Sequence, residues 1–114
     1  MNIKIDSIVT VTVDRVLGSV HPKYNDLIYP INYGYIKGIM ANDGEYQDAY
    51  IVGVNEPVDT FTGKVIAIIK RNNDIEDKLV VAPADMKFTK KEIEQLTLFQ
   101  EKYFETEIIM KNEK

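Results

Sequence analysis

The sequence predicts a small, mainly β protein of the α+β class, in which a β-barrel carries one helix near the C-terminus. Short runs rich in β-branched and aromatic residues recur along the chain as far as Ala82, with turn residues between them. After Thr89 the hydrophobic period changes from two residues to three or four. The chain has 114 residues, of which 45% are hydrophobic and 28% charged, as expected for one globular domain with its own core.

Several segments are expected to form strands. The first alternates apolar and polar side chains, which is typical of a half-buried strand. The second contains Pro30 and Gly34, which indicate an edge, a bend or a bulge. The expected strands are residues 8–13, 27–39, 48–54, 63–69 and 78–82, with a last short one at 108–110.

One helix is expected near the C-terminus. Thr89 and Glu92 have the spacing of a capping box, in which the two residues satisfy each other's backbone N–H groups. Apolar and amphipathic side chains then recur three and four positions apart, at Ile93, Leu96, Phe99, Gln100 and Tyr103. We therefore expect one domain over residues 1–110, an OB-like barrel with a helix at about 89–104, followed by a tail at 111–114.

Composition excludes several classes of function. The chain has no cysteine, which rules out disulfides and thiolate metal sites and fits a reducing compartment. No apolar run has the length of a membrane span, and residues 1–8 lack the apolar region of a signal peptide, so we expect a cytoplasmic protein that does not bind membranes. The formal net charge of -4, without a dense Lys/Arg block, argues against nucleic acid as a partner.

Two acidic clusters follow expected turns. Asp43, Glu45 and Asp48 surround an Asn-Asp-Gly turn, and a second group lies just before the strand at 78–82. Carboxylate oxygens are the ligands that hard divalent cations prefer. If the barrel brings both turns to one rim, these side chains need cations or must point apart into water, because like charges repel. Solvated acidic turns are the alternative.

Tyrosine and basic residues near these turns could bind phosphate. A tyrosine hydroxyl can donate to a phosphate oxygen, although a packed aromatic strand is the favoured interpretation for Tyr29 and Tyr35. Arg15 has the guanidinium fork that suits phosphate, although it also follows Asp14 and could form an ion pair with it. Lys78 directly follows the second acidic cluster and could serve either purpose.

The order of these motifs resembles family I soluble inorganic pyrophosphatases. The blocks that carry the resemblance are "VDR", "YPINYGYI", "DGEYQDAYIVGV" and "DKLVVAP", with a weaker continuation at "FQEKYF". The resemblance implies a five-stranded OB-like barrel. It also implies hydrolysis of pyrophosphate to two phosphates, dependent on Mg²⁺ or Mn²⁺, by a metal-activated water. Members of the family form homo-oligomers, which we expect here as well.

The resemblance also implies roles for individual residues. The expected metal ligands are Asp43, Asp48 and Asp77, with Glu76 as an alternative to Asp77 and with Asp74 as a further carboxylate. The expected catalytic residues are Glu45, which orients the attacking water, and Asp48. The expected substrate-binding residues are Arg15, Tyr29, Tyr33, Lys78 and Tyr103.

The chain departs from the family pattern in four respects. Glu45 stands where the family has Asp, and Phe104 stands where it has a phosphate-binding Lys. Most of the N-terminal strands are absent, and an extra loop carries His21, which we expect to be a surface residue. These departures leave an alternative, a divergent member that binds metal and a phosphorylated ligand with little or no turnover. A plain OB-type interaction module with solvated acidic turns is a third hypothesis.

Overall fold

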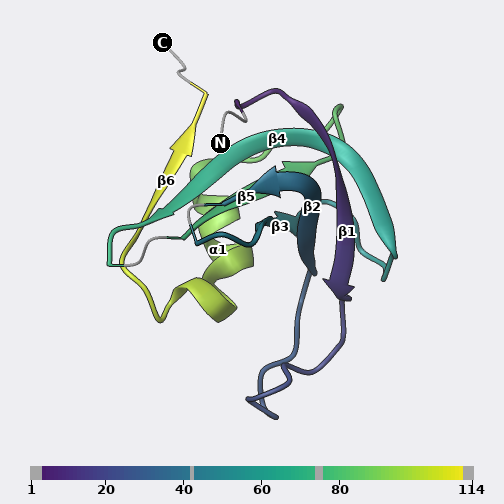
Figure 1. The fold of residues 1–114 in the computed structure, drawn as a ribbon, viewed down its shortest axis with the longest axis vertical. Helices are drawn as coiled ribbons and strands as arrows, with labels where there is room; N and C mark the ends of the chain where they lie inside the picture. The colour runs from purple at the N-terminus through teal and green to yellow at the C-terminus, as the bar shows by residue number, and fades with distance from the viewer. Residues whose placement is uncertain (1–3, 42, 74–75, 112–114) are drawn as a thin grey trace.

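The computed structural model describes residues 4–41, 43–73 and 76–111 and has five strands closed into a barrel (Figure 1). A sixth strand and one helix lie outside the closed barrel. The elements are β1 (Ile8–Arg15), β2 (Asn32–Met40), β3 (Tyr46–Ile51), β4 (Thr60–Arg71), β5 (Asp77–Ala82), α1 (Lys90–Glu101) and β6 (Thr106–Met110). The predicted small OB-like barrel with a C-terminal helix is confirmed.

The barrel closes through pairings between strands that are distant in the sequence. Its strand order is β1-β2-β3-β5-β4, and β1 also pairs with β4. All pairs are antiparallel except β3 with β5, which run parallel. At Gly34 the strands β1 and β2 approach so closely that a Cβ atom would lie 1.9 Å from the Thr12 carbonyl oxygen. Only glycine fits there, which explains a glycine inside an aromatic strand.

Two apolar cores lie on the two faces of the same strands. Side chains at Ile51, Leu79 and Val81 fill the barrel interior, whereas Tyr50 and Val80 face outward toward α1. Because successive side chains of a strand point to opposite faces, Asp48 shares the outer side of β3 with Tyr50, and Lys78 shares that of β5 with Val80. This alternation positions the polar side chains described below.

The helix begins as predicted and ends earlier than expected. Thr89 and Glu92 form both hydrogen bonds of the capping box. The helix ends at Glu101, and the N–H groups of Tyr103 and Phe104 bond to carbonyls three residues back, as in a tightened last turn. Tyr103 therefore lies beyond the helix and is 65% exposed. No helix in the described part of the chain is both long and apolar enough to cross a membrane.

The edges of the sheet differ slightly from the sequence-based expectation. β2 starts at Asn32 rather than at residue 27, because the preceding segment forms an isolated bridge between Val20 and Ile28 and then reaches Pro30, which has no N–H group. The predicted last strand is present as β6 and pairs antiparallel with the second half of β4.

Candidate functional site

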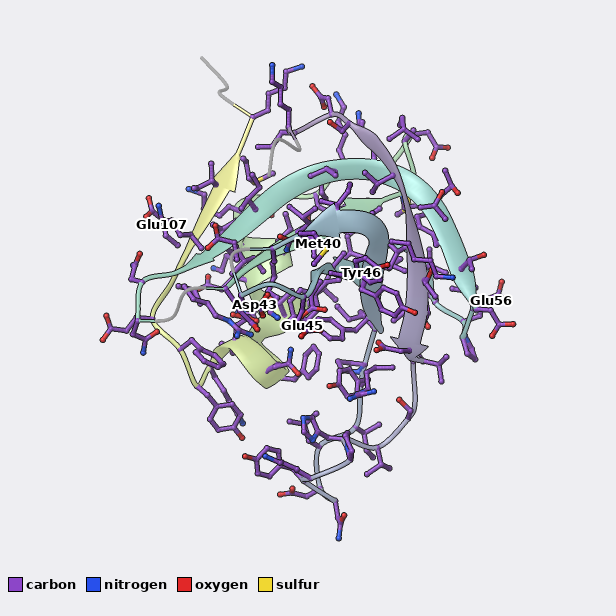
Figure 2. The ribbon with its side chains drawn as sticks, in the orientation of Figure 1. Met40, Asp43, Glu45, Tyr46, Glu56 and Glu107 are labelled. Carbon is purple, nitrogen blue, oxygen red and sulfur yellow. The ribbon has the colours of Figure 1, made fainter. Side chains whose placement is uncertain are left out.

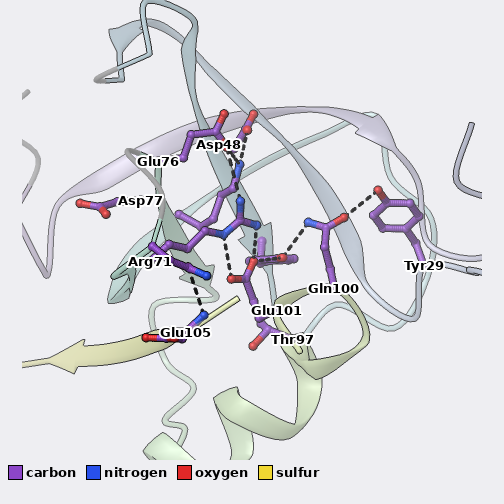
Figure 3. Close-up of polar contacts among 12 residues, drawn as sticks. Tyr29, Asp48, Arg71, Glu76, Asp77, Thr97, Gln100, Glu101 and Glu105 are labelled. Carbon is purple, nitrogen blue, oxygen red and sulfur yellow. Dashed lines mark hydrogen bonds and ion pairs between the residues drawn. The ribbon is translucent and has the colours of Figure 1, made fainter. Parts of the chain in front are cut away.

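Polar and charged side chains gather on the outer face of the barrel, where β3, β5 and the end of β4 meet the end of α1 (Figure 3). Asp48 and Lys78 lie there because they share the helix-facing side of β3 and β5 with Tyr50 and Val80. Arg71 lies there because it is two residues beyond Ile69, which packs in the same outer core. The alternation of strand residues thus brings acidic and basic groups into a largely buried place.

Lys78 is the centre of the first group of contacts. Its side chain is 4% exposed, and Nζ donates hydrogen bonds to Asp48 Oδ2 at 2.6 Å and to Glu76 Oε1 at 2.7 Å. Burial alone would lower the pKa of Lys78, yet this pKa is raised, because the oxygens of Tyr33 and Asp48 and the hydrogen bond to Glu76 outweigh it. Lys78 is therefore a permanent cation that joins two carboxylates from separate segments.

Asp43 and Glu76 bring the two acidic clusters into contact. Their carboxyl groups share a hydrogen bond, which lowers the pKa of Asp43 and raises the pKa of Glu76. The Glu45 N–H also donates to Asp43 Oδ1 at 3.0 Å, which fixes the turn between β2 and β3. Three carboxyl groups from the two clusters, those of Asp43, Asp48 and Glu76, are thus linked to one another directly or through Lys78.

The other predicted acidic residues lie elsewhere. Asp77 precedes Lys78 on β5 and therefore faces the opposite side of the strand, and Figure 3 shows its carboxylate apart from those of Asp48 and Glu76. Of the two residues expected as alternatives, Glu76 is the one that lies beside Asp48 and Lys78. Glu45 is exposed beside Asp43 in the turn (Figure 2). Asp74 lies outside the described residues.

A second group of contacts is a buried hydrogen-bond network. Arg71 donates from Nε to Glu101 Oε1 at 3.0 Å and from NH2 to Glu101 Oε2 at 2.7 Å. The Tyr50 hydroxyl donates to Glu101 Oε2 at 2.5 Å and accepts from Gln100 Nε2 at 2.8 Å. Gln100 Oε1 accepts from the Tyr29 hydroxyl at 3.1 Å. We call Tyr29, Tyr50, Arg71, Gln100 and Glu101 the helix-end network.

The predicted substrate-binding residues border these two groups of contacts. The ring of Tyr33 lies 5.7 Å from Lys78 Nζ and next to the ring of Tyr50, and burial raises the pKa of Tyr33. Tyr29 is buried, which raises its pKa, and interacts with Arg15 at the end of β1. The extra loop is not purely a surface feature, because the ring of His21 stacks on that of Tyr29 at 6.1 Å.

A cavity of about 300 Å³ connects the contacts of Lys78 with the helix-end network. Its floor includes Lys78 and Arg71, and its rim includes the exposed Tyr103. The Arg71 guanidinium lies 3.7 Å from the centre of the Phe104 ring. Phe104 is therefore covered by a cation from β4. The cavity is lined by His21, Tyr24, Leu27, Arg71, Lys78, Gln100, Tyr103 and Phe104.

The sequence reasoning missed Arg71 and Glu101, although both follow periodic patterns. Arg71 continues the alternation of buried residues along β4, and Glu101 follows Ile93 and Thr97 at helical spacing on the buried face of α1. A basic and an acidic residue at the buried positions of neighbouring elements are expected to pair, because an isolated buried charge is strongly unfavourable. The alternation along β4 and the helical spacing along α1 together therefore predict this ion pair.

The acidic residues fit a hard divalent cation in their chemistry. Carboxylate oxygens suit Mg²⁺, and Asp48 and Glu76 already converge on one cationic atom, Lys78 Nζ. Among the residues that the structure describes, no three acidic or histidine side chains form a ready-made metal site. Binding of a metal ion by Asp48 and Glu76 thus requires Lys78 to release them.

The fold and these contacts define a small OB-like barrel with a charged cavity on its outer face, and comparison with solved structures narrows the class. The chain superposes on an inorganic pyrophosphatase from Ehrlichia chaffeensis with a TM-score of 0.69 and 16% identity, covering 93% of this chain and 86% of that one. For the enzyme from Neisseria gonorrhoeae the TM-score is 0.59 and the identity 23%, over 81% and 70% of the two chains. For the inorganic pyrophosphatase from Helicobacter pylori the TM-score is 0.60 and the identity 13%, covering 98% of this chain and 88% of that one.

The chain therefore has the fold of the inorganic pyrophosphatases, in a shortened and divergent form. No protein-family model matches its sequence, and no curated protein matches it significantly.

Proposed function

We propose that this protein is a metal-dependent hydrolase that converts inorganic pyrophosphate to two phosphates. The observation that carries the proposal is that Asp48 and Glu76 meet on the buried cation Lys78, with Asp43 bonded to Glu76, in the fold of inorganic pyrophosphatases. Carboxylates beside a fixed cation can hold both a divalent metal ion and the phosphate groups that it accompanies.

Asp43, Asp48 and Glu76 are the residues that would hold Mg²⁺. When bound, the ion would supply an activated water and would stabilise the negative charge that develops on the phosphate oxygens. In this proposal Glu76 takes the place that the sequence assigned first to Asp77, since Glu76 lies on the side of the site and is already hydrogen-bonded to Asp43.

The remaining residues of the site position the substrate. Lys78 is buried, and its Nζ lies 5.7 Å from the centre of the Tyr33 ring, so its ammonium group has a defined place from which to donate to a phosphate oxygen. Tyr103 lines the cavity, and Tyr33 lies beside Lys78, so both could present hydroxyl groups to the substrate. Glu45 stands at the exposed edge of the turn, where its carboxylate can accept a proton from the attacking water.

Phosphate release from pyrophosphate in the presence of Mg²⁺ tests the proposal. We expect hydrolysis by the unmodified protein, and at least about a tenfold loss in Asp48→Asn, because loss of a metal-site carboxylate weakens both metal affinity and positioning. Asp85→Asn is the matched control, since Asp85 is an exposed carboxylate in the segment after β5.

Equal rates in the unmodified protein and Asp48→Asn would refute the hydrolase proposal. Calorimetric titration with Mg²⁺ and inorganic phosphate would then show whether the protein binds these ligands without turning over, which is the remaining alternative for this fold.

A further inference from the structure

We propose that Arg71 is a phosphate-binding residue of the site and that Glu101 is the residue that positions it. The inference rests on the proposed function and extends it to the helix-end network. Arg71 and Lys78 are both nearly buried, with side chains 5% and 4% exposed, and both line the same cavity. Two cations at the floor of one cavity make it suited to an anion that carries more than one negative charge.

The contacts of Arg71 fix the direction in which it can donate. Glu101 binds one edge of the guanidinium through Nε and NH2, at 3.0 and 2.7 Å. Glu101 is itself held by the Tyr50 hydroxyl at 2.5 Å. The NH1 group, on the other edge, lies 3.5 Å from Glu76 Oε1. The guanidinium fork is therefore anchored at its back and directed toward the predicted metal-binding carboxylates.

Glu76 links the two cations to the expected metal ion. Its Oε1 atom contacts both Lys78 Nζ at 2.7 Å and Arg71 NH1 at 3.5 Å. If Glu76 becomes a metal ligand, both cations lose part of their interaction with it. A phosphate oxygen beside the metal can restore that interaction, because a guanidinium binds phosphate with the same geometry as carboxylate. Replacement of Glu76 by a phosphate oxygen as the partner of NH1 would give Arg71 a role beyond its pairing with Glu101.

Phe104 restricts the guanidinium further and provides a way to test its role. The central carbon of the guanidinium lies over the Phe104 ring, 3.7 Å from the ring centre. A lysine at position 104 would therefore bring an ammonium group close to the place that the guanidinium now occupies. If charge at this place binds phosphate, a cation introduced from position 104 should replace one removed from position 71.

The test measures binding of inorganic phosphate to the Mg²⁺-loaded protein by titration calorimetry. The main variant is the double substitution Arg71→Met and Glu101→Gln, which removes both charges of the buried pair and so avoids leaving one of them unpaired. We expect phosphate affinity to fall about ten- to hundredfold, because hydrogen bonds to charged groups are strong. Removal of the negative charge of Glu101 by itself would strengthen phosphate binding. A weaker phosphate affinity in the double variant therefore comes from the loss of Arg71.

Two further variants keep the test specific. Addition of Phe104→Lys to the double variant should restore at least part of the affinity. Lys70→Met is the matched control, since Lys70 is exposed and adjacent to Arg71 on β4, and it should bind phosphate as the unmodified protein does. Thermal unfolding of each variant shows that binding is compared between folded proteins.

Unchanged phosphate affinity in the double variant would overturn the inference, as would a loss of similar size in Lys70→Met. A loss that Phe104→Lys leaves uncorrected would also overturn it, because the loss would then come from repacking. Pyrophosphate hydrolysis separates this inference from the proposed function: an inactive protein that binds phosphate through Arg71 refutes only the function, and an active protein indifferent to Arg71 refutes only the inference.

Discussion

The acidic residues Asp43 and Glu45 and the helix-end network lie close to the same site, but their environments are opposite. Glu45 is exposed, and Asp43 is only partly buried. Arg71 and Glu101 have side chains only 5% and 4% exposed, with two direct hydrogen bonds between them. Charges at the turn can change partners at little cost, whereas the buried pair of Arg71 and Glu101 cannot separate at little cost. We therefore expect the turn to be adaptable and this pair to hold the Arg71 guanidinium in place.

The largest effect should come from breaking the buried ion pair. Arg71→Met leaves the Glu101 carboxylate buried without its partner, and we expect the free energy of unfolding to fall by about 3–5 kcal/mol. The double substitution with Glu101→Gln should recover most of that loss, because no charge is then left unpaired. Urea denaturation measures both, and a single variant as stable as the unmodified protein would contradict the contrast between network and turn.

A second comparison concerns neighbouring carboxylates at the start of β5. Glu76→Gln should lower pyrophosphate hydrolysis by about tenfold to hundredfold, because its carboxylate is directed into the site. Asp77→Asn should leave the rate nearly unchanged, because Asp77 faces the other side of the strand. Steady-state rates at several Mg²⁺ concentrations give the measurement. The reverse order would assign the ligand position to Asp77.

Tyr50 should make the network sensitive to alkaline pH. Burial and then the nearby Glu101 carboxylate raise the pKa of Tyr50 well above its ordinary value near 10. Above pH 10 the unfolded chain releases this proton before the folded protein does, so stability should fall as the pH rises. Tyr50→Phe should lower stability by about 1–2 kcal/mol at neutral pH, through lost hydrogen bonds, and should make the alkaline decline shallower. Thermal unfolding between pH 7 and 11 checks both effects.

The smallest effect is expected at the turn itself. Asp43→Asn removes the carboxylate that accepts a hydrogen bond from Glu76, so the raised pKa of Glu76 should move down toward its ordinary value. Carbon-13 NMR titration of the carboxyl groups measures this shift. Stability should change by no more than about 0.5 kcal/mol, since Asp43 lies at the surface. An unchanged pKa of Glu76 would mean that the two groups do not interact in solution.

Most of the fold could be predicted because its elements follow simple periods. The alternation in residues 8–13 and the capping box at Thr89 and Glu92 act locally, and the structure contains both the strand and the capped helix. The end of the helix was misplaced, because Tyr103 continues the helical spacing although the chain has already left the helix. Local periodicity does not report where tertiary contacts stop an element.

The site was only partly predictable, because its residues meet through pairings that no local pattern specifies. The carboxylates of Asp43 and Asp48 and the cation of Lys78 were named from motif order, and the structure links them. The distinction between Glu76 and Asp77 depends on the exact residue at which β5 begins, since a shift of one residue reverses every side chain. Strand boundaries are the least certain part of a sequence-based prediction, and here they decide which carboxylate reaches the site.

The parallel pairing of β3 with β5 has a consequence for folding during synthesis on the ribosome. β5 pairs with both β3 and β4, so the barrel cannot close until the ribosome has synthesised β5, the last of its five strands along the sequence. Lys78 lies on β5, so its contact with Asp48 cannot form before β5 has been synthesised. We therefore expect a chain that ends before β5 to lack both the closed barrel and the ion pair of Lys78 with Asp48.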